Sequence, residues 1–140
     1  MIILDTNVVS ELMNPRCDPI VRRWIDSVER SMVHSTAVTS YEIEFGIARL
    51  PAGKRKETLI ASWREVLEVF LVDRILSFDH AAGLKAGELK QIALEAGNNC
   101  DICDILIAGI ACSRDAAVAS RNLVHISGLP VRVINPWSTA

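Results

Sequence analysis

The feature that most constrains the fold is a series of short apolar runs separated by longer helical segments. The first run, residues 2–4, is too short for a helix and stops at Asp5. Similar runs follow at residues 32–36, 74–78, 117–120 and 131–134. Such short runs, alternating with helical segments, predict an α/β sandwich with a small, mainly parallel sheet.

Helical segments are predicted from capping residues and helix stops. The expected helices cover residues 6–13, a segment that starts near residue 19, and residues 40–50, 54–70, 80–96 and 101–114. A chain of 140 residues fits one domain, residues 1–140. Ligands of parallel sheets bind beyond the carboxyl ends of the strands, so functional residues are expected there.

Membrane and secreted proteins are disfavoured by the apolar pattern. The most apolar stretch, residues 66–76, contains Glu68, Asp73 and Arg74, whereas a spanning helix needs about 20 apolar residues. Asp5 interrupts the first apolar run before a signal-peptide core can form. The sequence therefore predicts a cytoplasmic protein with no membrane partner.

The four cysteines are open to two interpretations. Cys100 and Cys103 form a CxxC pair, which is typical of zinc or redox sites. A structural zinc site needs a second close pair of ligands, and Cys17 and Cys112 do not form one. We therefore favour the interpretation that the cysteines are small buried apolar residues.

The charge balance limits how the chain can bind a polyanion. The net charge is −2, so nucleic acid binding requires metal ions or a local basic patch. One such patch is formed by Arg49, Lys54, Arg55 and Lys56. A solvated helix end explains this patch equally well.

Two acidic residues follow predicted strands. Asp5 comes directly after the first strand, and Glu42 lies near the start of the helix predicted after the second. Each has an alternative role: Asp5 suits a helix N-cap, and Glu42 completes a capping box in the segment Thr39-Ser40-Tyr41-Glu42. Glu42 also opens an otherwise apolar turn, so it can face inward.

Asp104 is the strongest single candidate. Apolar residues surround it from Ile102 to Cys112, which is typical of a buried helix. A carboxylate there is costly unless it meets a cation or a full set of donors. Asp101, one turn earlier, is better explained as the N-cap.

Together, Asp5, Glu42 and Asp104 predict a metal site. Like charges placed close together repel, and a hard divalent cation compensates them. Mg²⁺, or alternatively Mn²⁺, prefers oxygen ligands and needs only a few carboxylates. Such an ion can activate water and stabilise charge that develops on a phosphate.

Five ordered segments also resemble PIN-domain toxins of the VapC/FitB type. They are ILDTNVVSEL (3–12), EIEFGIARLP (42–51), CDILIAGIA (103–111), ASRNLVH (119–125) and VINPW (133–137). The resemblance covers nearly the whole chain. It implies a PIN-like three-layer α/β/α sandwich in which the acids at positions 5, 42 and 104 bind the metal.

The resemblance also implies a function and partners. It implies a ribonuclease that is the toxin of a bacterial toxin–antitoxin pair. Such a toxin forms a homodimer, is silenced by an antitoxin, and reaches operator DNA only through that antitoxin. Thr6 and Asn7 match positions that support the first Asp, although Thr6 equally suits a capping role.

The fourth segment departs from the family pattern. The family commonly has an acid at the position of Asn122 or His125, and both residues are neutral here. Asn122 or His125 is therefore a possible fourth ligand or water-orienting group, and a solvated loop residue is the alternative. A regulatory module with weak or no nuclease activity, or a phosphohydrolase acting on small phosphoesters, would also fit these residues.

Overall fold

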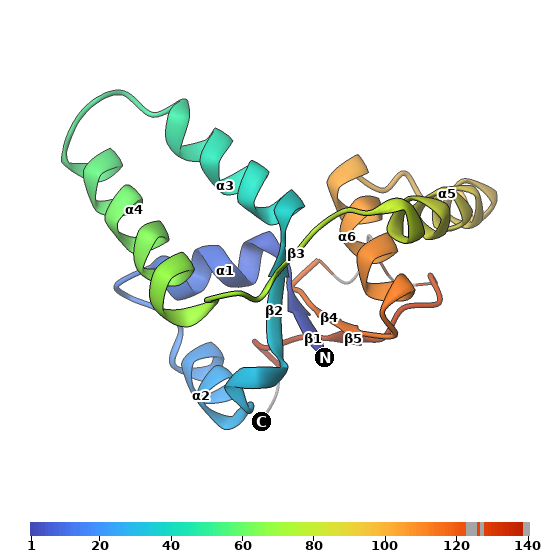
Figure 1. The fold of residues 1–140 in the computed structure, drawn as a ribbon, viewed down its shortest axis with the longest axis horizontal. Coiled ribbons are helices and arrows are strands. Elements are labelled where there is room, and N and C mark those ends of the chain that lie inside the picture. The colour runs from blue at the N-terminus through green and yellow to red at the C-terminus, as the bar shows by residue number, and fades with distance from the viewer. Residues whose placement is uncertain (123–125, 127, 139–140) are drawn as a thin grey trace.

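A computed structural model describes residues 1–122, 126 and 128–138. Its sheet has five strands in the order β3-β2-β1-β4-β5, and every neighbouring pair is parallel (Figure 1). The strands are β1 (Ile2–Leu4), β2 (Val33–Thr36), β3 (Ile75–Leu76), β4 (Ala117–Ala119) and β5 (Val133–Ile134). The α-helices are α1 (Thr6–Met13), α2 (Pro19–Ser27), α3 (Ala37–Ala48), α4 (Lys54–Glu65), α5 (His80–Glu95) and α6 (Ile102–Ser113).

Alternating side chains of the central strands divide the core into two halves. Leu4 and Ala119 pack with α1 to α4, whereas Ile3 and Val118 pack with α5 and α6. This separation follows from the two-residue period of a strand. The helices therefore cover opposite faces of the sheet, and the predicted α/β/α sandwich is confirmed (Figure 1).

The register of the sheet places two polar residues side by side. Leu4 of β1 pairs with Ala119 of β4. The next residues, Asp5 and Ser120, therefore leave the sheet together at its carboxyl edge. Both are almost completely buried.

Two helices begin or end differently from the sequence prediction. Helix α3 begins at Ala37 rather than at residue 40, because the Thr36 hydroxyl accepts a hydrogen bond from the backbone N–H of Thr39 (3.2 Å). The predicted capping box with Glu42 is therefore wrong. Helix α4 ends at Glu65 and continues as a π-helical turn, η2 (Val66–Phe70).

The short connection after α2 forms a 3₁₀ turn, η1 (Arg30–Met32), so β2 begins one residue later than predicted. Within the described ranges, we find no helix with both the length and the apolar character needed to span a membrane.

Candidate acidic active site

Asp5 is both a helix cap and a buried site carboxylate. It is 3% exposed, and its Oδ1 accepts a hydrogen bond from the Thr6 backbone N–H (2.7 Å). Its Oδ2 accepts hydrogen bonds from the Ser120 hydroxyl (2.7 Å) and from Nδ2 of Asn7 (3.2 Å). The two roles considered for Asp5 are thus compatible, and these donors hold its carboxyl group in one orientation.

Ser120 was not identified as a site residue by the sequence analysis. Its side chain is fully buried, and its Oγ also accepts hydrogen bonds from the backbone N–H of Asn122 (3.0 Å) and from Nδ2 of Asn7 (3.3 Å). A polar residue directly after an apolar strand was the available signal. The pairing of β1 with β4, which brings Ser120 to Asp5, was not visible in the sequence.

Asn7 supports Asp5, as the family resemblance implied. It joins three segments, because its Nδ2 reaches Asp5 and Ser120 while its Oδ1 accepts the backbone N–H of Arg121 (3.2 Å). The first turn of α1 and the chain after β4 are therefore tied together around the Asp5 carboxylate.

Glu42 faces inward from α3 and meets a different residue of α1. The hydroxyl of Thr6 donates a hydrogen bond to Oε1 of Glu42 (2.6 Å) and lies 3.1 Å from the hydroxyl of buried Thr39. The side chain of Thr6 thus supports the second acid rather than the first, which corrects the expectation for this residue. The cap of α1 is Asp5, not Thr6.

The surroundings of Glu42 favour its protonated form. Burial raises the pKa of Glu42, the hydrogen bond from Thr6 acts in the opposite direction, and the negative charges of Asp5 and Asp101 raise it further. The carboxyl group of Glu42 is therefore sensitive to any nearby positive charge.

The first turn of α6 contributes two more acids. Asp101 is the N-cap, since its Oδ1 accepts a hydrogen bond from the backbone N–H of Cys103 (2.8 Å), and it is exposed. Asp104 lies in the same turn and is half-buried. The capping interpretation of Asp101 is confirmed.

Cys103 shows that the acids from three elements lie near one another. Burial and then the negative charges of Glu42, Asp101, Asp104 and Asp5 raise the pKa of its thiol to about 11. A thiol of this kind stays protonated near neutral pH, so it is a poor nucleophile. This agrees with the apolar interpretation of the CxxC pair.

The acids gather at this edge without forming a closed metal site among the residues that the structure describes. Among the described residues, no three side chains of His, Cys, Asp or Glu converge closely enough to enclose a metal ion. The donor chemistry nevertheless fits a hard cation, because the candidate ligands are carboxylate oxygens and neighbouring negative charges oppose ionisation of Glu42. The assignment of Asp5, Glu42 and Asp104 as metal ligands stays a prediction.

The candidates for a fourth ligand remain untested. The backbone N–H of Asn122 bonds to Ser120, which places this residue beside the site, and its side-chain role stays a prediction. His125 lies outside the described residues.

Two surface hollows flank the helices. An apolar hollow of about 380 Å³ adjoins the acids, and it includes Tyr41 and Cys103, the sequence neighbours of Glu42 and Asp104. A larger hollow of about 420 Å³ lies between α1, α2, α4 and η2 and contains none of the acids. The candidate acids therefore lie outside this larger hollow.

The basic patch lies at the turn between α3 and α4, away from the acids along α3 (Figure 1). One of its members, Lys56, donates to the backbone oxygens of Ala48 and Leu50 (3.4 and 3.2 Å). This cation therefore caps the end of α3, which favours the helix-end interpretation.

Comparison with known proteins places this arrangement in a family. Residues 2–125 match the family model described as "PIN domain". The chain is 34% identical to "VapC ribonuclease Y4jK" of Sinorhizobium fredii over 100% of both chains. It is 32% identical to "Toxin FitB" of Neisseria gonorrhoeae over 98% of this chain and 99% of that protein.

Solved structures agree with these matches. The crystal structure of FitAcB from Neisseria gonorrhoeae matches with a TM-score of 0.89 and 32% identity, over 99% of this chain and 100% of that one. A structure of FitAB bound to a DNA fragment, IR36, gives a TM-score of 0.90 and 31% identity, over 100% and 98%. This protein therefore belongs to the PIN-domain family, in its VapC/FitB branch.

Proposed function

We propose that the chain is a metal-dependent endoribonuclease and the toxin of a bacterial toxin–antitoxin pair. The observation that carries the proposal is the gathering of carboxylates from α1, α3 and α6 beyond the carboxyl ends of the strands, with Asp5 buried among hydrogen-bond donors. The names of the VapC ribonuclease and of toxin FitB support this function.

In this proposal Asp5, Glu42 and Asp104 hold Mg²⁺, or alternatively Mn²⁺. The bound cation would supply Lewis acidity and charge neutralisation at a phosphodiester. Asp5 has room for such a ligand, because a carboxylate offers roughly four acceptor positions and the described donors to Asp5 number three. Ser120 and Asn7 orient this carboxylate, so the free position has a fixed direction.

Glu42 is suited to holding a proton during hydrolysis. Its raised pKa brings the carboxyl group closer to the pH at which general bases work well. The hydroxyl of Thr6 holds Oε1 of Glu42, and the backbone N–H of the same residue holds Oδ1 of Asp5. Thr6 therefore positions the two carboxyl groups relative to each other. Glu42 would thus either bind the cation or accept a proton from the attacking water.

The proposed protein partner is a cognate antitoxin, through which the assembly would reach operator DNA. The solved structures named FitAcB and FitAB, the second bound to DNA, support this partner. RNA is the proposed substrate, and the cytoplasm is the proposed location. No membrane partner is proposed.

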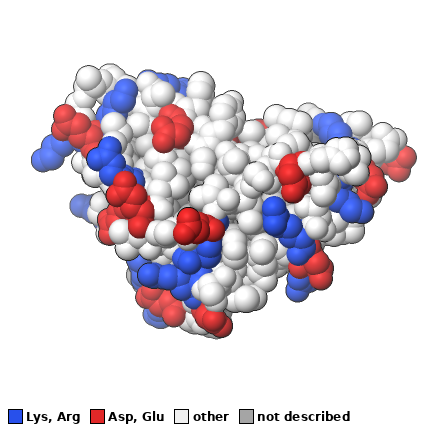
Figure 2. Space-filling model, in the orientation of Figure 1, with Lys and Arg blue, Asp and Glu red and all other residues white. Residues whose placement is uncertain are grey.

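We also propose that two copies of the chain pair. Tyr41, Phe45 and Ile102 each expose more than half of their surface, and the rings of Tyr41 and Phe45 stack with centroids 6.3 Å apart. Figure 2 shows an uncharged area near the centre of the view, with charged side chains toward its sides. Exposed apolar surface of this kind is typical of interfaces. Light scattering should give the mass of two chains, and a single-chain mass at all concentrations would contradict the pairing.

RNA cleavage by the partner-free protein tests the function. Purified chain is incubated with mixed single-stranded RNA in Mg²⁺ or Mn²⁺, with EDTA as one control and a folded Asp104→Asn variant as the other. Cleavage that requires metal and disappears in the variant is expected. Cleavage that survives in Asp104→Asn would show a contaminating nuclease.

Two results would favour the alternative functions. No cleavage of any RNA, with antitoxin and operator binding intact, would favour the regulatory module. Hydrolysis of a small phosphoester but not of RNA would favour a phosphohydrolase.

A further inference from the structure

Arg121 has a distinctive place at the carboxyl edge of the sheet. It is the only Lys or Arg among the three residues that follow each of the five strands, all of which the structure describes. The other residues of this edge near the site are acidic or neutral. Arg121 is therefore the cation that follows a strand end most closely along the chain. A polyanionic substrate that reaches Asp5 approaches this edge, where Arg121 offers a positive charge.

The backbone of Arg121 is fixed to the acidic network. Its N–H donates to Oδ1 of Asn7 (3.2 Å), and Nδ2 of the same Asn7 donates to Asp5 (3.2 Å). The preceding residue, Ser120, donates to Asp5 as well. The position from which the Arg121 side chain starts is thus set by the same hydrogen bonds that orient the first acid.

The side chain of Arg121 is also positioned. Its guanidinium carbon lies 4.5 Å from the centroid of the Trp137 ring, and Trp137 itself packs against the core formed with α1 to α4. A guanidinium placed over an indole ring can keep donors available to a ligand. The pair lies beyond the ends of the neighbouring strands β4 and β5.

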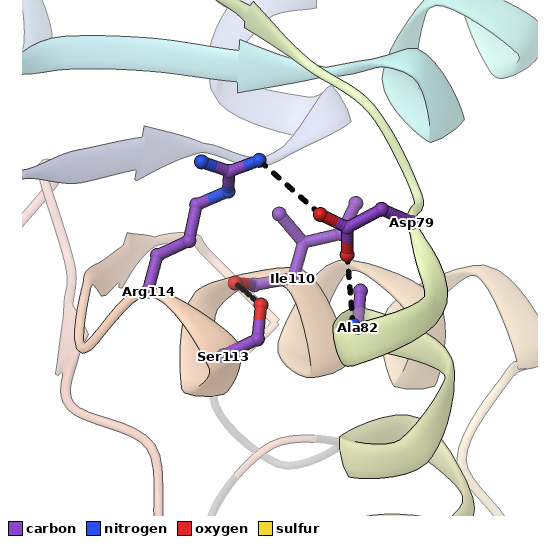
Figure 3. Close-up of polar contacts among 5 residues, drawn as sticks. All are labelled: Asp79, Ala82, Ile110, Ser113 and Arg114. Carbon is purple, nitrogen blue, oxygen red and sulfur yellow. Dashed lines mark hydrogen bonds and ion pairs between the residues drawn. The ribbon is translucent and has the colours of Figure 1, made fainter.

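Three of the other arginines, Arg74, Arg114 and Arg132, bind polar groups of the protein itself. Arg114 pairs with Asp79 at 3.7 Å (Figure 3), and Arg132 donates to the backbone oxygen of Asp115 at 2.9 Å. Arg74 donates to the backbone oxygens of Val33 and Phe70. By contrast, no described acidic side chain forms an ion pair with Arg121, which is exposed. Its donors are therefore available for an external anion.

We propose that Arg121, held over Trp137, binds a backbone phosphate of single-stranded RNA next to the scissile one. This inference rests on the proposed function and names a substrate contact for the same site. A planar guanidinium suits phosphate oxygens because it donates two parallel hydrogen bonds. Arg121 offsets the repulsion between the acidic edge and the RNA, and it acts as a binding residue rather than a catalytic one.

RNA binding by charge-matched variants tests this inference. Binding of a short fluorescent single-stranded RNA is measured in EDTA, so that the RNA stays intact, over a range of salt concentrations. The variants are Arg121→Gln, Arg121→Lys and, as control, Arg132→Gln, which removes the same charge just before β5 at the opposite edge of the sheet. Thermal unfolding is recorded for all of them.

Arg121→Gln should weaken binding roughly tenfold and reduce the slope of log K against log salt by about 0.7, the value for one phosphate of a single strand. Arg121→Lys should restore the slope but not the full affinity, because it keeps the charge and loses the planar fork. Arg132→Gln should bind as the wild type does. Unchanged affinity and slope in Arg121→Gln, or a lowered unfolding temperature alone, would overturn the inference.

Turnover in Mg²⁺ separates this inference from the proposed function. If the chain is a nuclease, Arg121→Gln should raise KM with kcat nearly unchanged. Metal-dependent cleavage with an unchanged KM would leave the nuclease standing and overturn the Arg121 contact. If no cleavage occurs but RNA binding still depends on Arg121, the nuclease proposal fails and the Arg121 contact stands.

Discussion

The two sides of the acidic edge are built differently. On the β1–β4 side, Asp5 is 3% exposed and accepts three hydrogen bonds from neighbouring groups. On the α6 side, Asp101 is exposed and Asp104 is half-buried, and the helix is placed by packing against α5. One side is thus buried and tied across the sheet by hydrogen bonds, and the other is more exposed and lies on a helix placed by packing against α5.

This difference teaches how a separated set of acids can still act together. The β1–β4 side fixes one carboxylate in advance, so little reorganisation is required there when a cation binds. The α6 side depends on how closely two helices approach. The following predictions disturb each side in turn, beginning with the largest expected effect.

Removing the Ser120 hydroxyl should disturb the side that is oriented by hydrogen bonds. Ser120→Ala is expected to reduce Mn²⁺ affinity or RNA cleavage by roughly 10-fold to 100-fold, because Asp5 loses a buried donor at 2.7 Å. Isothermal titration with Mn²⁺ and a cleavage assay measure the effect.

The matched control is Ser113→Ala in α6. The Ser113 hydroxyl donates to the backbone oxygen of Ile110 (2.8 Å), one turn back in the same helix and apart from the acids (Figure 3). This variant should bind Mn²⁺ as the wild type does. Equal losses in both variants would show a general packing effect and would contradict a specific role for Ser120.

Adding one methyl group to Gly109 should disturb the side that is oriented by packing. A Cβ at this position would lie 2.7 Å from the backbone oxygen of Ala82 and 2.8 Å from Cβ of Ala86, so α5 and α6 must separate. Gly109→Ala is expected to lower the free energy of unfolding by about 1–3 kcal/mol. Since α6 carries Asp104, cleavage should fall as well.

Gly46 in α3 offers the control for this substitution. Beyond its chain neighbours and the backbone of its own helix, no atom of the described residues lies within 4 Å of a Cβ built there, so Gly46→Ala should raise stability by roughly 0.5–1 kcal/mol through helix propensity. Chemical denaturation of both variants checks the pair. A stable Gly109→Ala protein with full activity would show that the close approach of α5 and α6 does not position the acids.

Replacing Glu42 should have the smallest effect on stability, and its sign depends on pH. Burial raises the pKa of Glu42 in the folded chain, so the stabilising contribution of its protonated form is complete below the unfolded value of 4.5 and is lost as the pH rises through the folded value. Without metal, Glu42→Gln should therefore be more stable than the wild type at neutral pH, by less than about 1 kcal/mol because Glu42 is only half-buried.

Thermal unfolding in EDTA across a pH series measures this difference. The two proteins should converge below pH 4.5. Saturating Mg²⁺ should reverse the order at neutral pH, because a bound cation favours the charged carboxylate. Equal stability at every pH would contradict a pKa of Glu42 raised by burial and by the neighbouring acids.

Local sequence signals predicted most of the fold. Short apolar runs indicated the strands, and Asp79 and Asp101, which were expected as caps, cap α5 and α6 through their side chains. The start of α3 was misplaced because Thr36, Thr39 and Ser40 are all good caps. Only the end of β2 decides among them, and strand ends are set by pairing with neighbouring strands.

The site was predictable in its acids and less so in their supporting residues. Asp5 and Asp104 stand out because charged groups follow or interrupt apolar segments. Ser120 contacts Asp5 from 115 residues away along the chain, and Thr39 contacts Thr6, the partner of Glu42, from 33 residues away. Such contacts depend on strand order and helix packing, and a single sequence does not display either.

Mn²⁺ binding by both sides of the edge tests the central claim most directly. The measurement is titration of Mn²⁺, followed by electron paramagnetic resonance, into the wild type, Asp5→Asn, Asp104→Asn and the double variant. If one cation joins the two sides, each single substitution should abolish most of the binding, and the double variant should lose little more. Wild-type affinity in Asp104→Asn, or strictly additive losses, would contradict a shared site.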